Sequence, residues 1–237
     1  MKRVLLSFKL VVRQIVTDGM LLAVCFASIL AGAFFRFAIP SLESLLCSYF
    51  DVAFVLQPYY RLFDLLLMIL SPYMFCFASA MVMLDEHEQQ LTRYLSVTPL
   101  QSHGYLISHL AIPAVMAGFA SLILLQFFHL TEWSLSQQLG MCILSALTGV
   151  VAGLIIFSCS HNKIEGMAMG KLSSLILLGL PIPYMFHDRY QYLFSPFPSY
   201  WMARFSIEGS LLFFLLSLVL SLVIIPFLYR KVLWKMV

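Results

Sequence analysis

The sequence predicts an all-α membrane protein with six transmembrane helices, and three observations support that fold class. Hydrophobic residues make up 62% of the chain and charged residues only 11%, whereas soluble domains carry about 25% charged residues. The mean hydropathy is +0.94. The apolar residues also gather in six long runs, and a helix needs roughly 20 such residues to cross a bilayer.

Each apolar run is expected to form one spanning helix. The first run ends at a cluster of Phe residues around Arg36, and aromatic and cationic side chains together are typical of a membrane interface. In the third run, Pro113 is expected to bend the helix because it removes a backbone donor. Residues 40–60 and 187–208 are expected to be loops, the second of them extracellular. The six runs cover residues 19–38, 62–84, 105–128, 135–159, 166–186 and 209–229.

Residues 1–18 precede the first span and are expected to form an amphipathic interfacial helix. Lys9 and Arg13 lie one turn apart, while Phe8 and Ile15 belong to a different face. Such a helix can place its basic groups among anionic lipid headgroups while its apolar face enters the membrane. A simple positively charged flank of the first span is the alternative.

The distribution of cations predicts the orientation in the membrane. Six spans put both termini on one side, and the opposite side then holds only four cations, leaving ten of the 14 Lys and Arg residues on the side of the termini. Cytoplasmic segments carry the excess of Lys and Arg. We therefore expect a multi-pass protein of the bacterial plasma membrane with a cytoplasmic N-terminus and a cytoplasmic C-terminus. The four cations on the other side are Arg36, Arg61, Arg189 and Arg204.

A dense polar segment between the second and third runs predicts a short cytoplasmic helix over residues 85–98. Asp85, Glu86 and Glu88 would occupy its first turn, where carboxylates favour the positive end of the helix dipole. Pro99 cannot continue the helix. The helix would be roughly 20 Å long. A plain polar linker between two spans is the alternative.

Two motifs begin like catalytic signatures without completing them. The sequence HEQQL starts like the zinc-protease motif H-E-x-x-H, but Leu91 stands where the second His must bind the metal. The sequence GMAMGKL resembles a Walker A loop, but it is one residue short and ends in Leu172 instead of Ser or Thr. The net charge of +3, without a basic and aromatic patch, argues against nucleic-acid binding. We expect no catalytic, metal-binding or cofactor-binding residue on this chain.

The order of the polar motifs resembles the permeases of type-2 ABC exporters, and most closely the small bacterial permeases that export drugs and antibiotic peptides. The segment LDEHEQQLTRYLSVTPL is similar to their coupling helix, and the resemblance extends along the whole chain. A basic helix before the first span, the polar connection NKIEG at 162–166 and the proline-aromatic loop SPFPSYW at 195–201 follow in the same order. One departure is Gln89-Gln90, which replaces the family's Gly-Thr.

The resemblance implies that this chain is one half of a dimeric, ATP-driven exporter and is not an enzyme. A second copy or a paralogue would complete the path, and separate ABC ATPase subunits would bind ATP and magnesium. The cargo would be lipophilic or amphipathic, such as a drug, an antibiotic peptide or a lipid. Whether the apolar face of the coupling helix meets the ATPase or the chain's own spans stays open. The residues implied in ATPase coupling are Asp85, Glu86, Glu88, Leu91, Arg93, Tyr94 and Leu95.

The alternative class is an ATP-independent secondary transporter or channel, which would need charged groups inside its spans. His109 is the nearest candidate for a proton relay, whereas Asp64 is expected to cap the membrane interface. The small residues Ser145, Gly149 and Gly153 recur every four positions. They are expected to form a close packing face of the fourth span within one subunit.

Overall fold

A computed structural model describes residues 2–90, 101–186 and 189–236, and every regular element within these ranges is helical. The expected all-α membrane fold is therefore confirmed. The helices are α1 (Lys2–Thr17), α2 (Gly19–Phe50), α3 (Tyr60–Glu88), α5 (Gln101–Leu106), α6 (Ile112–Phe128), α7 (Leu135–Cys159), α8 (Lys163–Ser173), α9 (Ile182–Met185), α10 (Pro198–Glu208) and α11 (Leu211–Met236). Four shorter elements are the 3₁₀ turns η1 (Gln57–Tyr59), η3 (Ser174–Gly179) and η4 (Arg189–Phe194) and the π-helical turn η2 (Ile107–Ala111).

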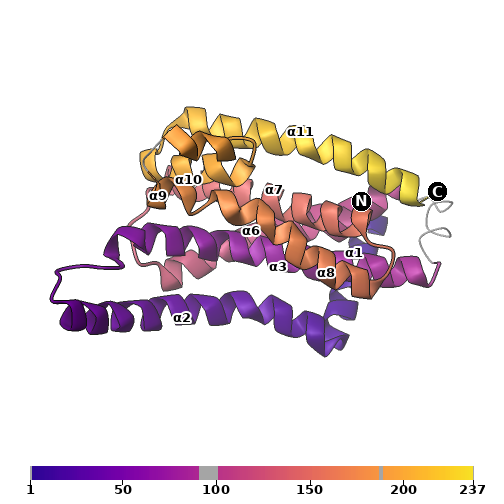
Figure 1. Cartoon of the computed structure of the whole chain (residues 1–237). Coiled ribbons are helices and arrows are strands. Elements are labelled where there is room, and N and C mark those ends of the chain that lie inside the picture. Colours follow the sequence, from indigo (N-terminus) through magenta and orange to yellow (C-terminus); the bar gives the residue numbers. More distant parts are fainter. Residues whose placement is uncertain (1, 91–100, 187–188, 237) are drawn as a thin grey trace.

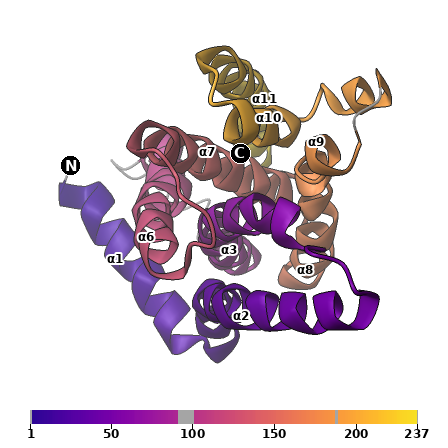
Figure 2. The same ribbon diagram turned by 90° about the vertical axis from the view of Figure 1, so that its left-hand side faces the viewer.

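The long helices run along one bundle axis, and α1 crosses that axis at one end (Figures 1 and 2). The chain termini in Figure 1 lie toward this same end, together with the C-terminal end of α3. We call it the inner end, and the end that carries α9 and α10 the outer end. An amphipathic helix that lies across the others is the arrangement expected of an interfacial helix.

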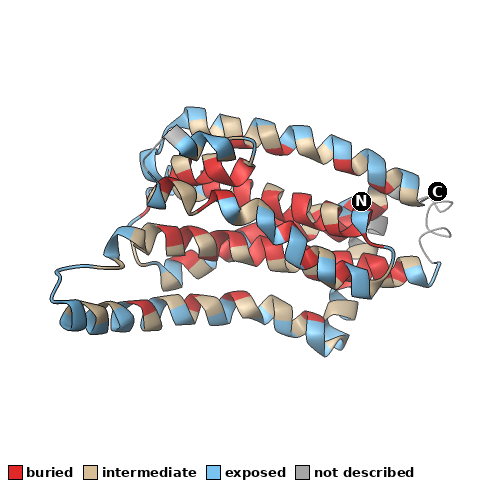
Figure 3. Ribbon diagram, in the orientation of Figure 1, coloured by how far each residue is buried: buried red, intermediate tan, exposed pale blue. Residues whose placement is uncertain are grey.

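Helices α3 and α7 form the centre of the bundle (Figure 3). The most apolar window of α3 is 72% buried and that of α7 is 61% buried, against 17% each for α2 and α11. A Cβ on Gly149 of α7 would lie 2.7 Å from the carbonyl oxygen of Pro72 in α3, and one on Gly153 would lie 2.5 Å from Leu110. The small residues of α7 thus bring these backbones together within one subunit, as expected.

Five helical stretches in the described residues are long and apolar enough to cross a membrane. They are Gly19–Phe50, Gln57–Glu88, His103–Phe128, Leu135–Cys159 and Leu211–Lys235. The expected span over residues 166–186 is not one continuous helix, because it is divided into α8, η3 and α9. Pro181 and Pro183 interrupt its backbone hydrogen bonding, and Gly179 lies against the backbone of Tyr200, where a Cβ would come within 2.7 Å of the amide nitrogen. The six-span count stays a prediction.

The prediction of a loop from residue 40 is wrong, because α2 continues through Pro40 to Phe50. Proline removes one backbone donor from the helix. The donor that is missing is the one for the carbonyl of Arg36, four residues earlier. The neighbouring serine hydroxyls bond to other carbonyls of the helix: Ser41 donates to that of Phe37 at 2.8 Å and Ser44 to that of Ser41 at 2.8 Å. Membrane helices tolerate such an interior proline.

The segment expected as an extracellular loop is largely helical in its described part. Helix α10 begins with Pro198, whose fixed φ suits the first helical position. It ends at Gly209, which has a φ of +67° and forms a left-handed cap. Tyr200, Met202 and Phe205 are buried. This part of the outer end therefore packs into the protein instead of crossing open solvent.

Candidate functional site

The predicted coupling segment begins at the C-terminal end of α3. Asp85, Glu86 and Glu88 belong to the last turns of this helix. The prediction that they open a separate helix is therefore wrong. The second span continues past residue 84, because residues 84–88 contain no proline or glycine that would end the helix. Leu91, Arg93, Tyr94 and Leu95 lie outside the described residues.

Glu86 joins the two helices that flank the undescribed segment. It is 8% exposed, and its Oε2 accepts a hydrogen bond of 2.7 Å from the hydroxyl of Tyr105 in α5. The Nε2 of His109 lies 3.3 Å from the same oxygen, although it has no hydrogen-bond partner among the residues that the structure describes. A buried carboxylate is costly unless such donors surround it. Glu86, Tyr105 and His109 are called the inner clasp below.

The π-helical turn η2 places His109 in the clasp. Pro113 has no N–H to donate to the carbonyl of His109, and the hydroxyl of Ser79 in α3 donates to that carbonyl instead. The ring of His109 lies 4.0 Å from that of Tyr105, centroid to centroid. The expected distortion at Pro113 is thus a π turn, an element found frequently at functional sites.

Helix α8 is attached to the same end of α3. Asn162 caps α8 by accepting a hydrogen bond of 2.7 Å from the amide of Glu165, whose carboxylate accepts one of 2.7 Å from the amide of His161. The cap exposes the amide of Lys163, which donates to the carboxylate of Glu88. A carboxylate at a helix N-terminus is a favourable arrangement.

Asp18 connects this end to α2. Its carboxylate caps α2 by accepting a hydrogen bond of 3.0 Å from the amide of Met20, and it forms an ion pair of 2.8 Å with Lys163. The hydrogen bond from Lys163 holds the pKa of Asp18 below its ordinary value, against the opposing effect of burial. The sequence offers Asp18 and Lys163 as isolated polar residues, and only the fold brings them together.

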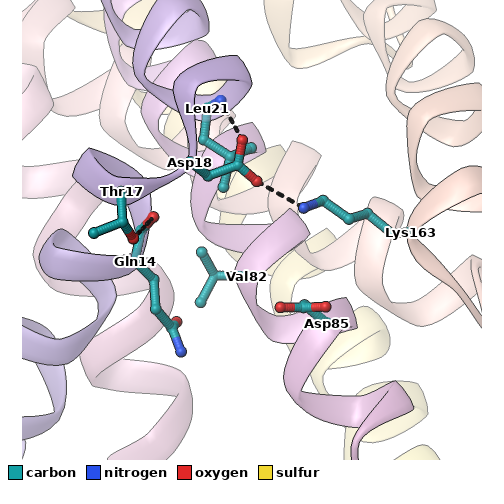
Figure 4. A pocket seen from close by; sticks show the side chains of 7 residues that line it. All are labelled: Gln14, Thr17, Asp18, Leu21, Val82, Asp85 and Lys163. Atoms are coloured by element: carbon teal, nitrogen blue, oxygen red, sulfur yellow. Dashed lines mark hydrogen bonds and ion pairs between the residues drawn. The ribbon is translucent and has the colours of Figure 1, made fainter.

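A hollow of about 370 Å³ lies between α1, α2, α3 and α8 beside this ion pair (Figure 4). Figure 4 shows Lys163 reaching toward Asp18, with Asp85 of α3 near the same space. No group of three His, Cys, Asp or Glu side chains suited to a metal ion occurs among residues 2–90, 101–186 and 189–236. At the inner end, hydrogen bonds and an ion pair connect α3 to α5 and α8, and α8 to the start of α2.

The outer end holds a second buried acid, Asp64 of α3, which is 1% exposed. Its carboxylate accepts hydrogen bonds from the amides of Leu130 and Thr131 at 2.8 and 2.9 Å, from the Thr131 hydroxyl at 2.6 Å and from the indole of Trp133 at 3.1 Å. These residues form the turn between α6 and α7, so Asp64 caps that turn. Arg36 also binds this turn, by donating to the carbonyl of His129 at 2.6 Å.

Comparison with known proteins identifies the family. Residues 11–231 match the family described as fluoroquinolones export permease protein Rv2686c-like. The chain belongs to this family of export permeases. The predicted relationship to exporter permeases is thereby confirmed, and the family together with the apolar helices indicates a multi-pass membrane protein.

Two curated relatives come from Mycobacterium tuberculosis: the fluoroquinolones export permease protein MT2760 of strain CDC 1551 / Oshkosh and the fluoroquinolones export permease protein Rv2686c of strain ATCC 25618 / H37Rv. Each is 25% identical over 128 residues, which cover 53% of this chain and 51% of the relative. The match thus spans about half the length of these relatives. No solved structure matches the chain.

Proposed function

We propose that this permease is the membrane-spanning subunit of an ATP-driven ABC exporter, working as a dimer with separate ATPase subunits that bind ATP and magnesium. The observation that supports this most is the inner clasp. Glu86 and Tyr105 lie on either side of segment 91–100 in the sequence, and their hydrogen bond of 2.7 Å ties α3 to α5. A force applied to the polar segment would therefore move both helices together.

The connections of α3 suggest how such a displacement spreads. At the inner end, Glu88 bonds to the amide of Lys163 in α8, and Lys163 is paired with Asp18 at the start of α2. Helix α3 has 29 residues, which corresponds to roughly 43 Å, and Asp64 near its other end is bonded to the turn between α6 and α7. A tilt of α3 would thus be transmitted to α2, α6, α7 and α8.

In this proposal, Leu91, Arg93, Tyr94 and Leu95 meet the ATPase, together with Asp85 and Glu88. Glu86 contributes by a different route, because its carboxylate is buried against the chain's own helices. We therefore assign it a positioning role: its bond to Tyr105 links the two ends of the coupling segment.

The proposed cargo is a lipophilic or amphipathic molecule, and an aromatic drug of the fluoroquinolone class is the first candidate because the two curated relatives are named for it. A hollow of about 440 Å³ between α2, α3 and α8 suits such a molecule. Its lining includes Met20, Met74, Met167 and Phe77, with one cation, Lys171. Flexible Met side chains adapt to ligands of different shape, and few polar groups suffice to orient a ligand in an apolar pocket.

Transport in proteoliposomes tests the proposal. The purified permease is reconstituted with and without a candidate ABC ATPase from the same organism, and uptake of a fluoroquinolone is followed after addition of ATP and magnesium. We expect uptake only when the ATPase and ATP are both present. Uptake driven by a proton gradient without the ATPase would overturn the proposal in favour of a secondary transporter or channel.

Copurification of the ATPase tests the coupling residues separately. Replacing Arg93 and Tyr94 by Ala should release the ATPase, whereas Glu86→Gln should retain it and lower transport. The matched control is Glu132→Gln at the outer end, an exposed acid on the turn between α6 and α7, which should change neither. ATPase binding that is insensitive to Arg93 and Tyr94 would remove the coupling role of the polar segment.

A further inference from the structure

A narrow hollow lies behind α1, between this helix and α2, α3 and α6. Its volume is about 240 Å³, and only hydrophobic side chains and a thiol line it. The lining includes Ile15 of α1, Cys25 of α2, Phe75 of α3 and Met116 of α6. Because no polar group faces this space, it suits a hydrocarbon chain and not a polar ligand.

Two cations lie beside the hollow, on the exposed surface of α1. A second, shallower hollow of about 550 Å³ is lined by Lys9 and Arg13, and it shares Val12 and Val16 with the first. Both cations are exposed, and neither side chain is bonded to an acid among the described residues. The sequence of α1, KRVLLSFKLVVRQIVT, contains no acidic residue that could pair with them. Lys9 and Arg13 are thus available to an anion from outside the chain.

The two hollows lie in the same order as the parts of a phospholipid, with the cations at the level of the headgroup and the apolar lining at the level of the acyl chain. Helix α1 crosses the end of the bundle (Figure 2), so its cations stand at the level of an interface. Phe75 lies 13 residues before the last residue of α3, Glu88, which is roughly 20 Å along the axis. Met116 is 55% exposed, and Phe119, one turn further along α6, is 60% exposed. An apolar path therefore leads from the cations toward the middle of the membrane.

We propose that the hollow behind α1 binds one acyl chain of an anionic phospholipid, whose headgroup is held by Lys9 and Arg13. Apolar surface and paired cations at the correct relative depth are both required for this ligand, and α1 provides both. The lipid would fill the space between α1 and α6 and would hold α1 against the bundle, where the hydroxyl of Ser108 donates to that of Ser7 at 3.0 Å. The proposal does not depend on coupling to an ATPase.

Native mass spectrometry of the full chain tests the site, with phosphatidylglycerol and phosphatidylcholine of equal chain length as probes. We expect the chain to retain one phosphatidylglycerol on the order of tenfold more tightly than phosphatidylcholine, since each basic residue near a membrane surface adds severalfold to the attraction of an anionic lipid. The double variant Lys9→Gln, Arg13→Gln should lose this preference. Val12→Trp, which narrows the hollow and keeps both cations, should weaken retention of both lipids.

The matched control is the double variant Lys171→Gln, Arg230→Gln, which removes two exposed cations from α8 and α11 and should keep the preference. The two double variants replace only exposed cations. Their helix content and their elution volume should therefore equal those of the unmodified chain. Equal retention of the two lipids by the unmodified chain would overturn the proposal. An equal loss in the control variant would also overturn it, because it would indicate diffuse attraction and not a site. Retention unchanged by Val12→Trp would overturn the assignment of the acyl chain to this hollow.

Discussion

Two buried acids on α3 hold the two ends of the bundle in different ways. Asp64 at the outer end accepts four hydrogen bonds from three residues of one turn, two of them from backbone amides. Glu86 at the inner end accepts a hydrogen bond of 2.7 Å from the hydroxyl of Tyr105, and the side chain of Gln14 in α1 is a further hydrogen-bond partner. The Nε2 of His109 stands 3.3 Å from the same carboxylate, while the other ring nitrogen, Nδ1, lies 3.0 Å from the carbonyl oxygen of Tyr105.

The difference suggests that the outer connection is fixed and the inner one adjustable. The lone pairs of Asp64 are occupied by groups whose positions the turn determines, so any rotation of α3 there breaks several bonds at once. Glu86 bonds to long side chains, and one of them lies next to the π-helical turn η2. Because side chains can change rotamer without moving the backbone, the hydrogen bonds of Glu86 can rearrange at a lower cost in free energy than those of Asp64. Such an asymmetry suits a helix that receives force at its inner end.

Removing the outer acid is the variant with the largest expected effect. Asp64→Ala leaves the amides of Leu130 and Thr131, the Thr131 hydroxyl and the Trp133 indole without their acceptor. We expect a loss of about 3 kcal/mol in the free energy of unfolding, because each buried donor without a partner is costly. Thermal unfolding in detergent measures it.

Asp64→Asn is the matched control for that variant. It keeps the shape and one carbonyl acceptor, so the loss should be about 1 kcal/mol. If Asp64→Ala lowers the free energy of unfolding by less than the amount expected for Asp64→Asn, the description of the outer end as the fixed connection is contradicted.

Removing the inner acid should have the second largest effect on stability and a larger effect on function. Glu86→Ala leaves the hydroxyl of Tyr105 without its acceptor, and we expect a loss of about 2 kcal/mol. In the proposed exporter, ATP-driven uptake should fall much further than the amount of folded protein. Uptake that falls only in proportion to folded protein would mean that Glu86 has a structural role alone.

Tyr105→Phe separates the hydrogen bond from the packing of the ring. The ring can keep its place against His109, while Glu86 loses one donor. We expect a loss of about 1 kcal/mol in the free energy of unfolding and partial loss of coupling, both smaller than in Glu86→Ala. Unfolding and uptake measured on the same preparations give this order, and a larger effect of Tyr105→Phe would point to another role of the hydroxyl.

The sequence predicts the parts of this protein that depend on local patterns. The apolar runs give the positions of the long helices, and the alternation around Lys9 and Arg13 gives α1. The place of Asp64 near the start of a span indicates a cap, but it does not indicate which turn Asp64 binds. Each of these inferences needs only a few neighbouring residues.

The remaining features depend on contacts between distant residues and on the surroundings of each helix. The continuation of α2 past Pro40 to Phe50 is one such feature, because a proline in the sequence does not reveal whether the helix ends there or continues. The clasp requires a contact between residues 86 and 105, and the pair of Asp18 and Lys163 joins positions far apart in the chain. A proline alone indicates a distortion at residue 113 but does not specify a π turn. Contacts between residues that lie far apart in the chain leave no pattern that a single sequence would reveal.

The smallest expected effect concerns the ion pair of Asp18 and Lys163. Asp18→Asn keeps a side chain that caps α2 and removes the charge that faces Lys163. We expect a loss below about 1 kcal/mol, because a partly exposed ion pair contributes little. Since Lys163 lowers the pKa of Asp18 in the folded protein, the pair stabilises the folded state above the pKa of the unfolded chain, near 3.8. That contribution disappears as the pH falls through the lower folded pKa.

The pH dependence distinguishes the pair from general changes in charge. The difference in unfolding free energy between the unmodified chain and Asp18→Asn should be constant from neutral pH to about pH 5 and should vanish at lower pH. Lys163→Met should show the same acid dependence, because it removes the other partner, whereas Lys171→Met on the same helix should not. Additive effects in the double variant Asp18→Asn, Lys163→Met would contradict a coupling between the two side chains. The inner end would then be held by the clasp of Glu86 and by the bond from Glu88 to α8, without a contribution from this pair.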